Sequence, residues 1–209
     1  MIKNLTQLTT PEIDYILLMS ALGNTYSQPK DKIARMIRSG EIIRVKKGLY
    51  VLGTDYGRPY SNPYLANLIY GPSYVSKEYA LSLHGMIPER VETVTSMCVG
   101  RSKSFKTPIG NFSFEHIPIE YFSVGFVREE IDSYRAYLVA TPEKALCDQL
   151  RTMEFDSTKE LYSYLLDGLR IEESTLRTLS LSQMHSIVGK SKTLTTFEML
   201  LEALEGIKK

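Results

Sequence analysis

The sequence predicts an α+β protein with two domains, one at residues 1–57 and a larger one at residues 58–209. Three observations carry this prediction. Segments with helical and strand periodicity alternate along the chain. A stretch rich in Gly, Pro, Asn and Tyr at residues 55–63 separates two patterned regions. Positive charge is concentrated before that stretch, whereas the whole chain of 209 residues has a net charge of only +1.

The first helix is predicted to begin near Thr10, which can cap it. Pro11 suits the first helical turn, where its missing N–H costs nothing, and Glu12 suits the positive end of the helix dipole. Apolar side chains then lie on more than one side of the helix, so we expect it to be largely buried. The helix is expected to end near Gly23.

A second helix is predicted between about Ser27 and Gly40, with an apolar stripe at i, i+3, i+4 spacing formed by Ile33, Met36 and Ile37. Residues 41–45 then read as a strand, residues 46–48 as a tight basic turn and residues 49–52 as a returning strand. Helix, glycine, strand, basic turn and strand is the order of a recognition helix followed by a wing. The sequence therefore predicts a winged helix-turn-helix in the first domain.

This winged helix is predicted to be abbreviated. A complete one has three helices before its wing, whereas here only two are predicted, separated by residues 23–28. Either residues 1–8 supply the missing helix or the domain lacks it.

The second domain is predicted to combine helices with a mainly antiparallel sheet and to end in a helical region. Thr141 and Pro142 are placed to cap and open a helix. The expected helices are at residues 63–70, 76–84, 141 onward and beyond 156, and the expected strands are at residues 91–99, 105–107, 111–116, 122–127 and 134–139.

The chemistry of the first domain favours a polyanionic partner. Seven lysine or arginine side chains lie between residues 30 and 47, against two acidic ones. Phosphate oxygens attract such cations, while glutamine can pair with adenine and arginine or lysine with guanine. A solvated helix face would carry the same composition, so that alternative stays open. The candidate DNA-binding residues are Gln28, Lys30, Lys32, Arg35, Arg38, Arg44, Lys46 and Lys47.

No metal site, cofactor or catalytic residue is predicted. The three histidines lie far apart in the sequence; His84 is interpreted as a helix cap and His116 as a core or edge residue. Cys98 and Cys147 are expected to be buried free thiols. The segment 189–191, Gly-Lys-Ser, resembles the end of a P-loop, but it lacks the required earlier glycine and is expected to follow a helix.

One helix could instead suggest a nuclease-like acidic cluster. Glu143, Lys144 and Asp148 are close in the sequence. Because residues four apart share a helix face, Lys144 and Asp148 are more simply interpreted as a surface ion pair. An enzyme would require metal-dependent activity that is lost when Glu143 or Asp148 is changed.

Several segments resemble the AbiEi family of antitoxin-type transcriptional regulators. Residues 44–52 resemble the wing of that family, and residues 140–148 resemble its most recognisable helix opening. The resemblance covers roughly residues 30–150, and nothing after about residue 155 matches. The other matching segments are residues 72–76, 80–81, 84–89, 93–96, 101, 105 and 114–117.

The resemblance implies a regulator that binds double-stranded promoter DNA and represses its own operon. DNA contacts are expected from positions 28–38 and 44–47. In toxin–antitoxin and phage-defence operons of this family, the neighbouring gene encodes a nucleotidyltransferase-like toxin that the antitoxin counters. A homodimer on DNA is left open, as is the operator sequence. The alternative function is a toxin-binding interaction module without specific DNA binding.

The sequence also predicts a cytoplasmic protein. No apolar run approaches the length of about 18 residues that spans a bilayer, and the N-terminus lacks the pattern of a signal peptide. No membrane partner is expected.

Overall fold

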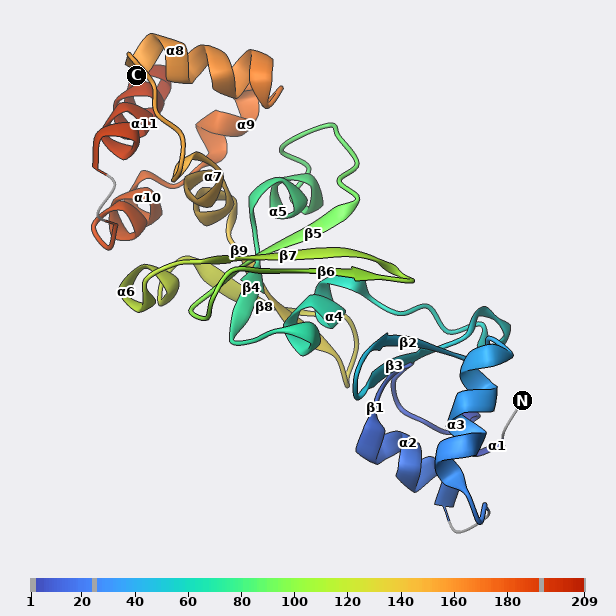
Figure 1. Cartoon of the computed structure of the whole chain (residues 1–209). Helices are drawn as coiled ribbons and strands as arrows, with labels where there is room; N and C mark the ends of the chain where they lie inside the picture. Colours follow the sequence, from blue (N-terminus) through green and yellow to red (C-terminus); the bar gives the residue numbers. More distant parts are fainter. Residues whose placement is uncertain (1–2, 24–25, 192–193, 209) are drawn as a thin grey trace.

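The computed structural model describes residues 3–23, 26–191 and 194–208. It confirms the α+β class: a small sheet with helices near the N-terminus, a larger sheet with helices, and a group of C-terminal helices (Figure 1). Within the described ranges, no helix combines the length and apolar character needed to cross a membrane.

The N-terminal part, residues 3–56, builds its own small hydrophobic core. Its three strands form an antiparallel sheet in the order β1-β3-β2. Ile13, Leu18, Met36 and Tyr50 are among the residues buried between this sheet and the helices. The elements are α1 (Lys3–Thr6), β1 (Glu12–Asp14), α2 (Tyr15–Leu22), α3 (Pro29–Arg38), β2 (Ile42–Lys46) and β3 (Leu49–Leu52).

The predicted start of the first long helix is wrong. Glu12 to Asp14 form strand β1, which pairs with β3, and the carbonyl of Pro11 accepts a hydrogen bond of 2.9 Å from Leu52 N. Asp14 then caps α2, because its Oδ1 accepts from Leu17 N at 2.7 Å. A short helix, α1, precedes β1, so the described residues before the β2–β3 hairpin form the helices α1, α2 and α3. Residues 1 and 2 lie outside the described ranges.

Helix α2 is also less buried than predicted. Leu18 and Leu22 are buried, but Ile16 is 78% exposed and Leu17 is 37% exposed. One side of this eight-residue helix packs into the small core through Leu18 and Leu22. The apolar residues on its other side therefore face solvent.

The second part of the chain is organised around a six-stranded sheet. Its order is β6-β7-β5-β4-β9-β8. The sheet is mixed: three of its strand pairs are antiparallel, whereas β4 pairs with β9 and β5 with β7 in parallel. The strands are β4 (Ser73–Val75), β5 (Thr93–Cys98), β6 (Lys103–Thr107), β7 (Gly110–His116), β8 (Phe126–Glu130) and β9 (Ala136–Ala140).

Most predicted helices of this part are confirmed. Thr141 caps α7 as expected, since its Oγ1 accepts from Lys144 N at 3.3 Å. The predicted strand at 122–127 is displaced, because a short helix, α6, ends at Phe122 and the strand starts at Phe126. The helices are α4 (Asn62–Ile69), α5 (Lys77–Leu83), α6 (Ile119–Phe122), α7 (Pro142–Leu150), α8 (Thr158–Ser163), a π-helical turn (Tyr164–Gly168), α9 (Glu173–Thr178), α10 (Leu181–Val188) and α11 (Leu194–Lys208).

Lys144 and Asp148 form an ion pair, but the prediction that it lies on the surface is wrong. Both side chains are fully buried, with Lys144 Nζ 3.6 Å from Asp148 Oδ1. Asp148 Oδ2 also accepts hydrogen bonds from Ser76 Oγ at 2.6 Å and Tyr74 OH at 3.0 Å. Helix α7 lies between α5, α10 and α11, so its polar face has no access to solvent (Figure 1).

Burial changes the acidity of this pair. Desolvation lowers the pKa of Lys144 to about 8, although the charge of Asp148 opposes this change. Desolvation likewise raises the pKa of Asp148, opposed by Lys144 and by the hydroxyl donors. Neither group is accessible to a substrate in this conformation.

A second buried charge joins the N-terminal part to the large sheet. The Glu12 side chain is fully buried, and its Oε1 accepts from Ser61 N at 2.8 Å and lies 3.2 Å from Arg135 Nη1. Arg135 stands just before β9. Residues of β3, among them Val51, also belong to the core of the second part. The domain boundary at residue 57 therefore stays a prediction.

We expect Asp148→Ala to lower the free energy of unfolding by about 3–5 kcal/mol, because it leaves the buried Lys144 ammonium without its counter-charge. Arg128→Ala is the control. It breaks an exposed ion pair with Glu130 and should cost less than about 1 kcal/mol. Urea unfolding measures both values, and equal losses would contradict the buried-pair assignment.

Glu12→Ala should also destabilise the protein by about 3–5 kcal/mol, because Arg135 and the Ser61 N–H both lose their acceptor. A double-mutant cycle with Arg135→Ala tests the link. The double variant should be clearly more stable than the sum of the two single losses implies. Simple additivity would mean that the two side chains do not depend on each other.

Candidate nucleic-acid interface

Helix α3 carries three of the predicted basic residues that are exposed: Lys30, Arg35 and Arg38. Ile33 and Met36 are buried against the small sheet and fix the orientation of the helix. Residues four apart share a flank, so Lys30, Ala34 and Arg38 lie along one exposed side. Arg35 is exposed beside them. The helix therefore offers several cations to solvent along its outer surface.

The β2–β3 hairpin supplies cations from a second element. Its strands turn at Lys47 and Gly48, where Gly48 has a φ of +86° that favours glycine. Arg44 lies opposite Tyr50, on the side of the hairpin that faces α3. Arg44 and Lys47 are both exposed.

A groove of about 600 Å³ lies between α3, the hairpin and the start of α2. It brings together Lys30 from α3 with Arg44 and Lys47 from the hairpin. Among the described residues that line it, none is acidic. The apolar or aromatic lining residues are Tyr15, Ile33, Ala34, Ile37 and Tyr50, and Gly48 completes the groove. Two elements thus place cations on opposite sides of one apolar groove.

Lys46 is directed elsewhere. A register irregularity between Arg44 and Lys46 places Lys46 opposite Leu49, and its Nζ donates to the carbonyl of Ile69, the last residue of α4. Partial burial lowers the pKa of Lys46 below its ordinary value. A cation near the last carbonyls of a helix is favourable. Lys46 therefore stabilises contact between the two parts of the chain and is not presented with Lys47.

Lys32 is partly neutralised, whereas Gln28 is open to solvent. Lys32 Nζ lies 3.9 Å from Glu41 Oε1 and 5.6 Å from the ring centre of Tyr26, and its side chain is 19% exposed. Gln28 is exposed and precedes α3 without a side-chain capping bond. Of the eight predicted residues, three meet at the groove: Lys30, Arg44 and Lys47. Gln28, Arg35 and Arg38 lie exposed on or next to α3.

Sequence reasoning missed the apolar lining of the groove. Tyr15 is 36% exposed and belongs to α2, which was expected to be buried. Its backbone N–H donates to Gly48 O at 2.9 Å, so α2 begins against the hairpin turn. The sequence did contain a signal for this exposed surface. The apolar run of this helix is longer than one helix face can bury, so some of its residues had to be exposed.

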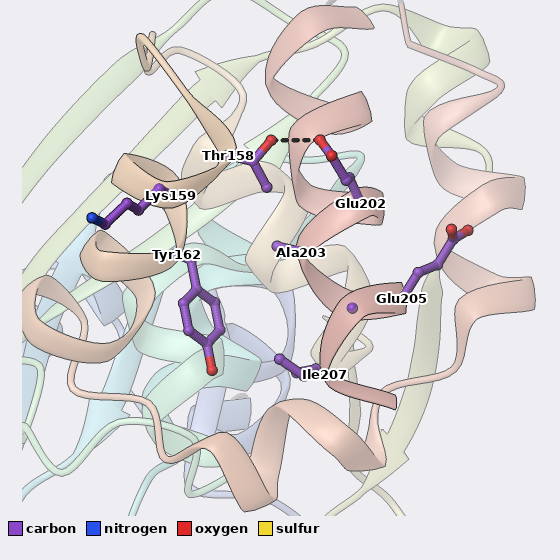
Figure 2. Close-up of a pocket in the computed structure, with 8 residues that line it drawn as sticks. Thr158, Lys159, Tyr162, Glu202, Ala203, Glu205 and Ile207 are labelled. Carbon is purple, nitrogen blue, oxygen red and sulfur yellow. Dashed lines mark hydrogen bonds between the residues drawn. The ribbon is translucent and has the colours of Figure 1, made fainter. Parts of the chain in front are cut away.

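The groove between α8 and α11 has a different chemistry (Figure 2). Glu202 and Glu205 line it, and Thr158 Oγ1 donates to Glu202 Oε2 at 2.6 Å. Lys159 also lines this groove, and Figure 2 shows its ammonium directed away from Glu202. Two carboxylates with one outward lysine do not suit a polyanion. The groove at α3 is the better match to nucleic acid.

The histidines, the cysteines and the Gly-Lys-Ser segment were the other groups considered in the sequence. His84 ends α5 and its Nε2 lies 2.8 Å from the carbonyl of Ala140, whereas His116 is exposed at the end of β7. Cys98 and Cys147 are buried free thiols, as predicted. The Gly-Lys-Ser segment follows helix α10, as expected, whereas a P-loop follows a strand. In the described part of the chain, no three His, Cys, Asp or Glu side chains are grouped to hold a metal ion.

No protein-family model matches the chain, and no curated protein sequence matches it. The resemblance to AbiEi regulators thus continues to depend on the short segments quoted above.

Proposed function

We propose that this protein is a DNA-binding transcriptional regulator whose N-terminal part is a winged helix-turn-helix. The order α1, β1, α2, α3, β2, β3 supports this proposal, since α3 then takes the position of a recognition helix and the β2–β3 hairpin that of a short wing. The observation that carries it is the meeting of Lys30, Arg44 and Lys47 around one groove without an acidic lining residue.

The arrangement suits duplex DNA for a geometric reason. A recognition helix enters the major groove, and a wing contacts the neighbouring backbone or minor groove. One sugar–phosphate strand then passes between the two elements. Cations on both sides would neutralise its phosphates, while Ala34 and Ile37 would pack against deoxyribose carbons. Arg35 and Gln28 are exposed and have the chemistry to read base edges.

The mechanism that we propose is equilibrium repression. Lysine and arginine displace counterions from the DNA backbone, and a few side chains discriminate the operator of the protein's own promoter. Following the AbiEi resemblance, the protein would also counter a nucleotidyltransferase-like toxin encoded by a neighbouring gene. A homodimer would bind two half-sites about 34 Å apart or a multiple of this spacing.

One observation favours the alternative of a protein-interaction module without specific DNA binding. Ile16 is 78% exposed beside the groove residue Tyr15, and exposed apolar surface often marks a protein contact. This alternative predicts that the protein does not bind DNA even at low salt. It also predicts that the protein captures the neighbouring gene product and that Ile16→Ser abolishes this capture.

The triple change Lys30→Ala, Arg44→Ala and Lys47→Ala should weaken binding to promoter DNA. It should make the slope of log affinity against log salt shallower by roughly 2 to 3, at about 0.9 for each phosphate contact. Fluorescence anisotropy at several salt concentrations measures this slope. Lys46→Ala is the matched control, because Lys46 is a cation of the same hairpin but contacts the second part of the chain instead of the groove. An unchanged slope in the triple variant would contradict the proposed DNA interface.

Arg35→Ala should act on sequence preference more than on salt dependence. Loss of one base contact is expected to cost about 1–3 kcal/mol for the preferred operator and to relax discrimination at one base position. Competition against operators with single base changes measures the effect. If Arg35→Ala weakened binding to all sequences equally, Arg35 would be a phosphate contact instead.

A further inference from the structure

A separate cavity of about 520 Å³ lies where α6 and the ends of α7 and α10 meet. This volume falls within the range of small-molecule sites, about 300–1,000 Å³. None of its residues lines the groove at α3, so DNA binding does not account for it. The lining residues are Pro118, Glu120, Tyr121, Arg151, Gly189, Lys190 and Ser191.

Arg151 determines the chemistry of this cavity. It follows α7, and its Nη2 donates to the carbonyl of His116 at 3.3 Å, which holds one edge of the guanidinium in place. Its Nε is buried and has no hydrogen-bond partner among the residues that the structure describes. Because water cannot reach this nitrogen, a ligand in the cavity would meet the outer N–H groups of the guanidinium, which can pair with an oxyanion.

The other charged lining residues narrow the chemical class of ligand that the cavity could bind. Lys190, in the segment after α10, supplies a second cation from a different wall, and Glu120 on α6 supplies one carboxylate. Two cations from separate walls suit the dianionic charge of a phosphate monoester. Glu120 can accept hydrogen bonds from hydroxyl groups elsewhere on the same ligand. A nucleic-acid duplex is too large to enter this volume.

The cavity wall is connected to the buried ion pair. The carbonyl of Tyr121 accepts a hydrogen bond from Lys144 Nζ at 2.8 Å, and that ammonium lies 2.9 Å from the ring centre of Tyr121. This wall is consequently held by the core and does not depend on the ligand for its position. A preformed wall lowers the conformational cost of binding.

We propose that this cavity binds a small phosphate ester, with the phosphate at Arg151 and Lys190 and ligand hydroxyls at Glu120. The proposal is independent of DNA binding. Isothermal titration calorimetry of the full chain with AMP and glucose 6-phosphate tests it. At least one ester should bind ten or more times more tightly than inorganic phosphate, and adenosine and acetate should not bind. No heat from either ester at millimolar concentration would overturn the proposal, as would acetate binding as tightly as the esters.

Two variants locate the site. Arg151→Ala should weaken ester binding at least tenfold. Arg151→Lys should do so too, because an ammonium keeps the charge but loses the planar fork of donors. Arg151→Lys also serves as the test if Arg151→Ala unfolds, which thermal unfolding monitored by circular dichroism reveals. Arg170→Ala is the control, since Arg170 is an exposed partner of Glu89 outside the cavity. Wild-type affinity in Arg151→Lys would overturn the assignment.

Discussion

The alternation of side chains along β3 joins the two hydrophobic cores of the molecule. All four residues of this strand are buried. Tyr50 and Leu52 face the helices of the N-terminal part, while Leu49 and Val51 belong to the core of the second part. The β2–β3 hairpin is therefore the middle layer between two cores. Its cations lie in two places: Arg44 and Lys47 line the groove beside α3, and Lys46 contacts the carbonyl end of α4.

Buried charges fix the arrangement around these layers. Apolar contacts tolerate small shifts, but a buried carboxylate requires donors at hydrogen-bond distance. Glu12 meets this requirement with Ser61 and Arg135, and Asp148 with Ser76 and Tyr74. Replacing both members of a buried ion pair with apolar residues of similar volume is often tolerated or even stabilising, whereas removing one member leaves the other charge unpaired. Their contribution here is to select one relative position of the elements that carry them.

Three concave surfaces of the molecule differ in charge, because different elements line each of them. Cations around an apolar floor characterise the groove at α3. Two cations and one carboxylate line the cavity beside α6 and α10, whereas carboxylates dominate the groove between α8 and α11. The first lies in the N-terminal part, and the other two lie with the C-terminal helices at the opposite end of the molecule (Figure 1). DNA recognition and small-anion binding are thus proposed for distant surfaces.

Local periodicity and single residues such as Pro29, Gly48 and Thr141 were enough to predict the α+β class, the amphipathic helix α3, the hairpin after it and the N-terminal cap of α7. Strand β1 and strand β4 could not be predicted, since three residues carry too little periodicity and pair with partners distant in the sequence. Tertiary structure alone decided that Lys46 turns toward α4 and that Lys144 and Asp148 are buried. Charge patterns show which side chains share a helix face or a hairpin, but only the neighbouring elements decide whether that face meets solvent or a core.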